Sequence, residues 1–254
     1  MSWAARRRFI ILLIVGAIVV AFLAIVSIAT FYQTPSCSDE RQNQDEVGID
    51  CGGPCPYLCT IEQQPPTVLF TKTIRNGTER IDVIASIENK NATAAAKNVP
   101  YSITLYGTDQ TLIQQVSGVL DLPPGATVPV YVPGVTSGNQ KIANAFLEIA
   151  SSSPQWFKMA TDSRIIPIVS NTTLGGSTAA PRITAILTNS SVTALSNVQA
   201  IVFVRDAQND VIAASKTVVP TIPAQGQATA TFTWNGAFSS QATSVQVVPI
   251  IPLP

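Results

Sequence analysis

All four cysteines of this chain lie in one short string, CSDERQNQDEVGIDCGGPCPYLC, at residues 37–59. Cysteine sulfurs hold zinc, carry redox chemistry or form disulfides, and the spacing helps to decide between these uses. The gaps of 13, 3 and 3 residues contain no C-x-x-C pair of the kind that zinc ribbons use. We therefore expect two disulfides rather than a zinc site. Three pairings are possible, and we favour Cys37–Cys51 with Cys55–Cys59.

Hard oxygen donors gather in the same string, at Asp39, Asn43, Asp45, Glu46 and Asp50. Calcium takes about six to eight oxygen ligands, and the nearby glycines allow the sharp turns that such a site needs. The spacing is not that of an EF-hand. Two interpretations stay open: a solvated acidic loop held by disulfides, which we favour, and a calcium site built from these five residues.

The same string resembles a short cysteine-rich motif of bacterial envelope proteins, C-x-D-x-x-x-N-x-x-E-x-x-x-D-C-G-G-x-C. Glu40 departs from it, because the motif often carries glycine at that position. The resemblance covers residues 37–59 only. It implies a location in the cell envelope and no particular activity.

The composition argues against several classes of protein. The chain has no histidine, which excludes Ser-His-Asp and Cys-His nucleophilic sites and His-ligated zinc. Its 15 basic and 15 acidic residues balance, so there is no electrostatic footprint for a nucleic acid. We expect a protein that is not an enzyme, does not bind nucleic acid and has no cofactor other than the calcium considered above.

The elements that must position these residues begin with an uncharged run, residues 9–32, FIILLIVGAIVVAFLAIVSIATFY. As a helix it would measure roughly 36 Å, enough to cross the hydrocarbon core of about 30 Å. Its length favours an uncleaved signal anchor over a cleaved signal peptide. The membrane-anchoring residues are expected to be basic side chains on the cytoplasmic side and interfacial aromatics at the two ends: Arg6, Arg7, Arg8, Trp3 and Tyr32.

This anchor predicts the location of everything else. Residues 1–8 are expected in the cytoplasm and residues 9–32 in the cell membrane as a single pass, with the bulk of the chain extracytoplasmic. Thiols outside the cytoplasm are generally oxidised, which supports the disulfides. A cysteine-rich acidic collar, residues 33–60, and a linker, residues 61–66, would follow the anchor.

The remaining residues show internal similarity at a period of about 100. KNVPYSITLYGTDQTLI, residues 97–113, aligns without a gap with SNVQAIVFVRDAQNDVI, residues 196–212. Apolar and polar residues alternate in both copies, as in Val83, Ala85 and Ile87 between polar neighbours, which indicates strands with one buried face. We predict a mainly β protein with two tandem immunoglobulin-like antiparallel β-sandwiches, residues 67–162 and 163–254, arranged as a stalk.

Each copy also resembles the FxLYD-like modules of bacterial envelope and surface proteins. The residues that carry this resemblance in the first copy are a strand-ending Asn, two short strings and a proline-glycine turn: Asn89, Lys97-Asn98-Val99, Thr104-Leu105-Tyr106 and Leu122-Pro123-Pro124-Gly125. The second copy matches less closely. The resemblance implies a sandwich fold without catalytic residues.

The sequence also contains short strings of the glycosylation type and an aromatic group near its middle. Four N-x-[ST] strings begin at Asn76, Asn91, Asn171 and Asn189, and we interpret them as chance matches rather than glycosylation sites. Trp156 is expected to close a sandwich end or an interface.

The predicted function is a membrane-anchored structural or interaction protein with the lipid bilayer and envelope proteins as partners. The alternative is an accessory subunit of an envelope assembly, secretion or sensing complex.

Overall fold

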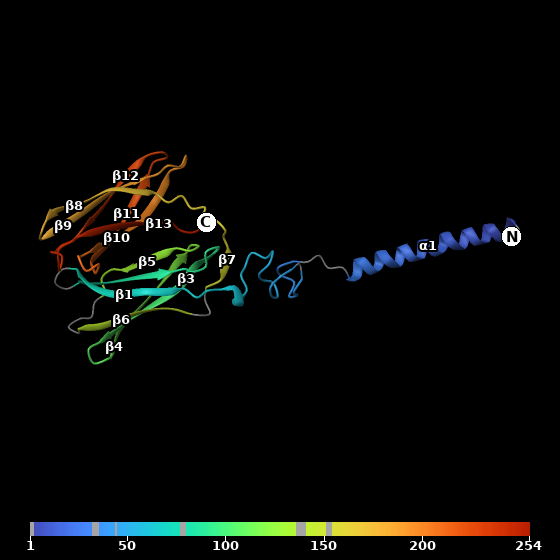
Figure 1. The fold of residues 1–254 in the computed structure, drawn as a ribbon, viewed down its shortest axis with the longest axis horizontal. Coiled ribbons are helices and arrows are strands. Elements are labelled where there is room, and N and C mark those ends of the chain that lie inside the picture. The colour runs from blue at the N-terminus through green and yellow to red at the C-terminus, as the bar shows by residue number, and fades with distance from the viewer. Residues whose placement is uncertain (1–2, 32–35, 44, 77–79, 136–140, 151–153) are drawn as a thin grey trace. The chain divides into compact units, whose positions relative to one another are not determined.

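The computed structural model describes residues 3–31, 36–43, 45–76, 80–135, 141–150 and 154–254 (Figure 1). Within it the chain forms two compact units, Met1–Pro56 and Tyr57–Pro254, which are described separately. The first unit holds the apolar helix and most of the cysteine-rich segment. The second holds all the strands.

The first unit begins with helix α1, Trp3–Phe31. Its segment Arg6–Ile28 is long and apolar enough to cross a membrane, and none of its apolar window is buried. A helix that is hydrophobic on every side is typical of a membrane span, because no soluble core receives its apolar surface. The predicted N-terminal apolar helix is confirmed.

The second unit begins with the short 3-10 helix η1, Thr60–Glu62, and continues as two β-sandwiches. The first sandwich packs one antiparallel sheet, in the order β1-β2-β5, against another, β4-β3-β6, with β7 paired to β3 (Figure 1). Its strands are β1 Thr67–Asn76, β2 Arg80–Glu88, β3 Ala94–Gly107, β4 Leu112–Leu122, β5 Thr127–Val132, β6 Ile142–Ile149 and β7 Trp156–Lys158.

The second sandwich has the same strand order, with sheet β8-β9-β12 against sheet β11-β10-β13. Its strands are β8 Ile168–Ser177, β9 Ala180–Thr188, β10 Leu195–Arg205, β11 Val211–Ile222, β12 Gln227–Thr233 and β13 Ser244–Ile250. Positive backbone φ angles also recur at matching places, at Asn98 and Asn197 in the third strand of each copy and at Gln110 and Asn209 in the following turn. The mainly β class predicted from the alternating pattern is confirmed.

Strand β2 differs from the predicted pattern because it is buried on both faces. Val83, Ala85 and Ile87 point into the core of the first sandwich, as alternation predicts. However, Ile84 on the opposite face is also fully buried, and Asp82 is only 1% exposed. The alternation of apolar and polar residues predicted that this face is exposed to solvent, because a local pattern does not show what packs against a sheet from outside.

The second sandwich packs against this outer face of β2. Ile84 and Tyr131 of the first sandwich share a buried apolar cluster with Ile201 and Phe203 of β10. Each fully buried aliphatic or aromatic side chain of this kind contributes about 1.5–3 kcal/mol. The sandwiches therefore pack through their outer sheet faces, which differs from the predicted stalk.

The same positions in the other copy explain why only these faces meet. Ile201 and Phe203 correspond to Ser102 and Thr104 of β3, 99 residues earlier, and Ile84 corresponds to Thr184 of β9, 100 residues later. Those polar side chains would leave hydroxyl groups in an apolar contact, which is unfavourable without hydrogen-bond partners. At these positions the face that meets the other sandwich is apolar, and its counterpart in the other copy is polar.

The residues after β13 also cross to the first sandwich. The backbone N–H of Leu253 donates to Asp121 of β4 at 2.8 Å, and the Leu253 side chain is buried. Arg164, between the sandwiches, donates to the carbonyl oxygen of Ile251 at 2.6 Å and forms a salt bridge with Asp162. These contacts hold the second sandwich to the first at the end where β13 finishes.

Candidate functional site

The N-terminal end of α1 carries the predicted anchoring residues. Arg6, Arg7, Arg8 and Trp3 are exposed, and the Arg7 guanidinium lies 5.7 Å from the centre of the Trp3 ring. This cation–π arrangement suits an interface in which the ring sits at headgroup level and the cation in water. Tyr32, predicted at the other end, lies outside the described residues.

The cysteine-rich segment pairs its cysteines differently from our expectation. Cys37 bonds to Cys55, with 2.01 Å between the sulfurs, so the favoured pairing of Cys37 with Cys51 and Cys55 with Cys59 is wrong. Cys51 and Cys59 are disulfide-bonded as well, and no described cysteine is free. The prediction of two disulfides is confirmed.

Folding of the acidic loop decides this pairing. The Asp50 carboxylate accepts hydrogen bonds from the backbone N–H groups of Asp39 and Glu40, both at 3.0 Å. The Cys55 N–H donates to the carbonyl oxygen of Gly52 and closes the following turn. Together these bonds lay the start of the segment beside its end, so that Cys37 meets Cys55.

Glu46 lies at the centre of this segment and is only 6% exposed. One carboxylate oxygen, Oε2, accepts from the N–H groups of Asn43 and Asp50, both at 3.3 Å. The other, Oε1, is 2.8 Å from the Cys55 sulfur. Within the described residues, Cys37, Glu46 and Cys55 form the one group of acidic and sulfur side chains close enough to share a metal ion. Because both sulfurs are in one disulfide, neither offers a thiolate, and the group is not a metal centre.

The five predicted calcium ligands are largely engaged with the loop itself. The Asp39 carboxylate accepts hydrogen bonds from the Asn43 amide and from the Arg41 N–H, and the Asn43 amide holds the pKa of Asp39 below its usual value. Asp50 and Glu46 cap backbone N–H groups as described above, and Asp45 is exposed. The carboxylates of Asp39, Glu46 and Asp50 are thus engaged within the loop, whereas the Asn43 Oδ1 is buried without a hydrogen-bond partner in the described structure, and calcium binding stays a prediction.

A buried polar cluster lies next to the contact between the sandwiches. The Asp82 carboxylate accepts hydrogen bonds from Tyr131 Oη at 2.6 Å, Gly134 N at 2.7 Å, Arg80 Nε at 2.8 Å and Asn76 Nδ2 at 3.0 Å. Burial alone raises the pKa of Asp82, but these donors outweigh it and hold the pKa below its usual value. Burial, together with the neighbouring carboxylate, raises the pKa of Tyr131.

This cluster predicts a dependence of stability on acid. The folded-state pKa of Asp82 is depressed, so its contribution is present above the unfolded-state pKa and is lost as the pH falls through the folded-state value. We expect the free energy of unfolding to decrease as the pH falls below about 4. Asp82→Asn should flatten that part of the profile in denaturant titrations, whereas Glu148→Gln at an exposed position of β6 should keep the acid limb of the parent chain. An unaltered acid limb in Asp82→Asn would contradict this assignment.

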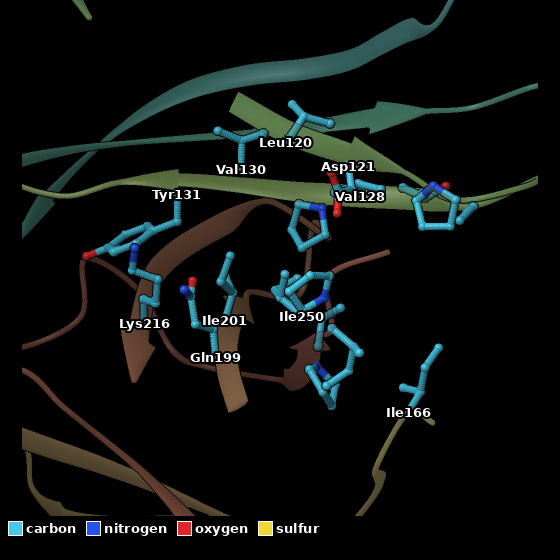
Figure 2. A pocket seen from close by; sticks show the side chains of 18 of the residues that line it. Leu120, Asp121, Val128, Val130, Tyr131, Ile166, Gln199, Ile201, Lys216 and Ile250 are labelled. Atoms are coloured by element: carbon cyan, nitrogen blue, oxygen red, sulfur yellow. The ribbon is translucent and has the colours of Figure 1, made fainter. Parts of the chain in front are cut away.

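A pocket of about 590 Å³ opens between the two sandwiches (Figure 2). Leu120, Val128 and Tyr131 line it from the first sandwich. Ile201 and Lys216 line it from the outer face of the sheet that contains β10 and β11. No pattern of residues indicated this pocket, because its walls come from strands far apart in the chain.

Sequence reasoning also missed two buried asparagines. Asn89 and Asn189, 100 residues apart, are 1% and 0% exposed. The side-chain amide of Asn89 donates to the carbonyl oxygens of Ala94, Leu122 and Pro123. That of Asn189 donates in the same way to three carbonyl oxygens, at Thr193, Ile222 and Pro223. Their equal places, directly after the corresponding strands β2 and β9, were the available indication.

The structure also shows where the asparagines of the N-x-[ST] strings and two of the tryptophans lie. Asn91 and Asn189 are buried and hydrogen-bonded, so glycosylation of either would require local unfolding, while Asn171 is exposed. Trp156 packs in the core of the first sandwich, and Trp234 in that of the second.

Comparison with known proteins identifies no relative. No family model and no curated protein matches the chain. Among solved structures, red sea bream transglutaminase is similar with a TM-score of 0.23 and 10% identity, over 72% of this chain and 31% of the transglutaminase. A β-glucuronidase of glycoside hydrolase family 2 gives 0.21 and 10%, over 87% and 29%. The chain thus spans under a third of either enzyme, and both TM-scores are too low to relate its fold to theirs.

Proposed function

We propose that this chain is a single-pass envelope protein that holds two immunoglobulin-like sandwiches outside the cell membrane and acts by binding rather than by catalysis. The observation that carries the proposal is the apolar segment Arg6–Ile28, which begins with three arginines. Basic residues flanking a span favour the cytoplasmic side, so the N-terminus lies inside.

The state of the cysteines supports the same orientation. All four are disulfide-bonded, and disulfides persist in oxidising compartments outside the cytoplasm. A cysteine-rich segment that directly follows a membrane span would sit close to the outer surface of the bilayer. Its two crosslinks would resist local unfolding and proteolysis there.

The sandwiches support a binding role. Their loops and sheet edges offer contact surface on a rigid scaffold, which is how many sandwich domains recognise partners. The buried carboxylates, Asp82 and Glu46, are engaged with backbone and side-chain donors of the fold itself. The Cys55 sulfur beside Glu46 is held in a disulfide, and the Tyr131 hydroxyl beside Asp82 is buried with a raised pKa, which favours a role without chemistry.

Labelling of intact cells tests the orientation. Two reporter variants, Ser2→Cys and Ser196→Cys, each add one free cysteine to the disulfide-bonded parent chain. Both would be treated with a membrane-impermeant maleimide. We expect Ser196→Cys to be labelled in intact cells and Ser2→Cys only after permeabilisation. The reverse result would overturn the orientation, and a mature chain that lacks residues 1–32 would show a cleaved signal peptide instead of an anchor.

A second candidate function, an accessory subunit of an envelope complex, is favoured by the surface of α1. Gly16, Ala17 and Ala21 lie in a shallow groove on this helix together with Leu13, Val20 and Ala24. Small residues allow close approach of another helix within the bilayer.

Substitution in this groove tests the second candidate. We expect Gly16→Leu to reduce recovery of a stoichiometric membrane partner at least tenfold, because the added side chain fills the groove. Ile18→Leu, at an exposed apolar position, is the matched control and should change nothing. Equal recovery from both variants would remove the helix groove as the basis for assembly.

A further inference from the structure

The pocket between the sandwiches has a roof and a floor of different character. Its roof comes from β4 and β5 and includes Leu120, Val128 and Tyr131, and its floor is the outer face of the sheet with β10, β11 and β13 (Figure 2). The pocket adjoins the buried contact made by Ile84 and Phe203. Twisted sheets packed through their faces diverge away from the point of contact, which explains a wedge of space here.

Aliphatic and proline side chains dominate the lining, and polar groups gather at one end. Lys216 and Gln199 project into the same end of the pocket as Tyr131, whereas Ile166 lies at the opposite end (Figure 2). Ile201 is the direct neighbour of Lys216 across the strand pair β10–β11. The pocket therefore has an apolar length and a polar end.

The charged side chains that line the pocket differ in whether they already have a partner within the protein. Asp121 accepts hydrogen bonds from the N–H groups of Asn98 and Leu253. Arg164 is paired with Asp162. No contact of Lys216 with an acidic group or a hydrogen-bond acceptor occurs among the described residues, and its side chain is exposed at the pocket wall. Asp82, which accepts a hydrogen bond from Tyr131 near this end, already forms a salt bridge with Arg80. Lys216 is thus the lining cation left to attract a ligand.

We propose that this pocket binds a single-chain amphiphile, an aliphatic chain with one anionic headgroup, whose anion meets Lys216. The exposed Lys216 ammonium supplies a charge complementary to an anionic headgroup at one end of the pocket, while the aliphatic walls would receive the chain. The volume falls within the range of about 300–1,000 Å³ that ligand pockets show. The proposal goes beyond a structural role for the sandwiches and does not depend on the orientation of the chain in the membrane.

The strand edges at the pocket argue against the main alternative, an extended peptide. Peptides that add to a sheet edge need its free N–H and C=O groups. β5 and β13 are edge strands whose pocket-lining residues include Pro129 and Pro249. Proline has no N–H to donate, and proline at an edge disfavours strand addition.

Binding of dodecanoate to the full chain in nanodiscs of zwitterionic phospholipid tests the proposal. The probe is carboxyl-¹³C dodecanoate, measured against empty nanodiscs. We expect saturable binding that weakens at least tenfold in Lys216→Met, which keeps the apolar stem and removes the charge. Lys90→Met, at an exposed lysine away from the pocket, is the matched control and should bind like the parent chain.

Two further arms locate the site and its natural source. Thr127→Trp adds bulk from an exposed position that lines the pocket and should abolish binding of dodecanoate. Competition by anionic phospholipid in the nanodisc would identify a membrane lipid as the source, and its absence a free fatty acid. The proposal is overturned if binding is not saturable above empty nanodiscs, or if Lys216→Met and Lys90→Met bind equally. Neither result would alter the maleimide labelling that tests the orientation.

Discussion

Asn189→Ala is expected to lower the free energy of unfolding by about 3 kcal/mol, and Asn89→Ala by a similar amount. The Asn189 amide satisfies three carbonyl oxygens, and its Oδ1 accepts from the N–H and the hydroxyl of Ser191. Alanine would remove all of these bonds from a fully buried position and would open a small cavity, while the Thr193 and Pro223 carbonyls would keep only their second donors, Ser191 Oγ and Gly226 N. Urea titration followed by tryptophan fluorescence would measure the change.

Comparison with an exposed asparagine isolates this effect. Asn144→Ala, on the exposed side of β6, should change stability by less than about 0.5 kcal/mol. Asn189→Asp is the more specific variant, because it keeps the shape and the acceptor oxygen but loses the donor to the carbonyls. If Asn189→Ala were no more costly than Asn144→Ala, the buried amide would not be holding the corner together.

Removal of the Cys37–Cys55 disulfide is the second change with a large expected effect. The bond closes a sequence separation of 18 residues, for which the chain-entropy model gives about 3 kcal/mol. Cys37→Ala combined with Cys55→Ala should therefore speed hydrogen exchange in the acidic loop about a hundredfold. The N–H groups of Asp39, Glu40 and Asp50 report this directly, because carboxylates of the loop accept all three.

The sandwiches provide an internal control for this experiment. Exchange of backbone N–H groups in β2 and β9 should be the same in the double variant and the parent chain, since their cores contain no cysteine. Mass spectrometry of a non-reduced digest should recover the Cys37–Cys55 crosslink. A Cys37–Cys51 crosslink instead would contradict the pairing on which the prediction rests.

The sequence by itself determined the local features of this protein. An uncharged apolar run long enough to span a bilayer can form little other than a buried or membrane helix, which α1 bears out. Period-two alternation predicted strands such as β2 and β10, and the even cysteine count predicted disulfides. Each of these depends on residues that are close together along the chain.

Only the tertiary structure decided which surfaces meet. The pairing of Cys37 depends on hydrogen bonds to Asp50, which no count of spacings contains. Burial of Ile84 depends on strand β10, which lies more than 100 residues later in the chain. Asn189 looked like a polar surface residue because its carbonyl partners lie on a distant corner. The physical reason is common to all three: contacts between distant segments decide burial, and local periodicity encodes only the preference of each segment.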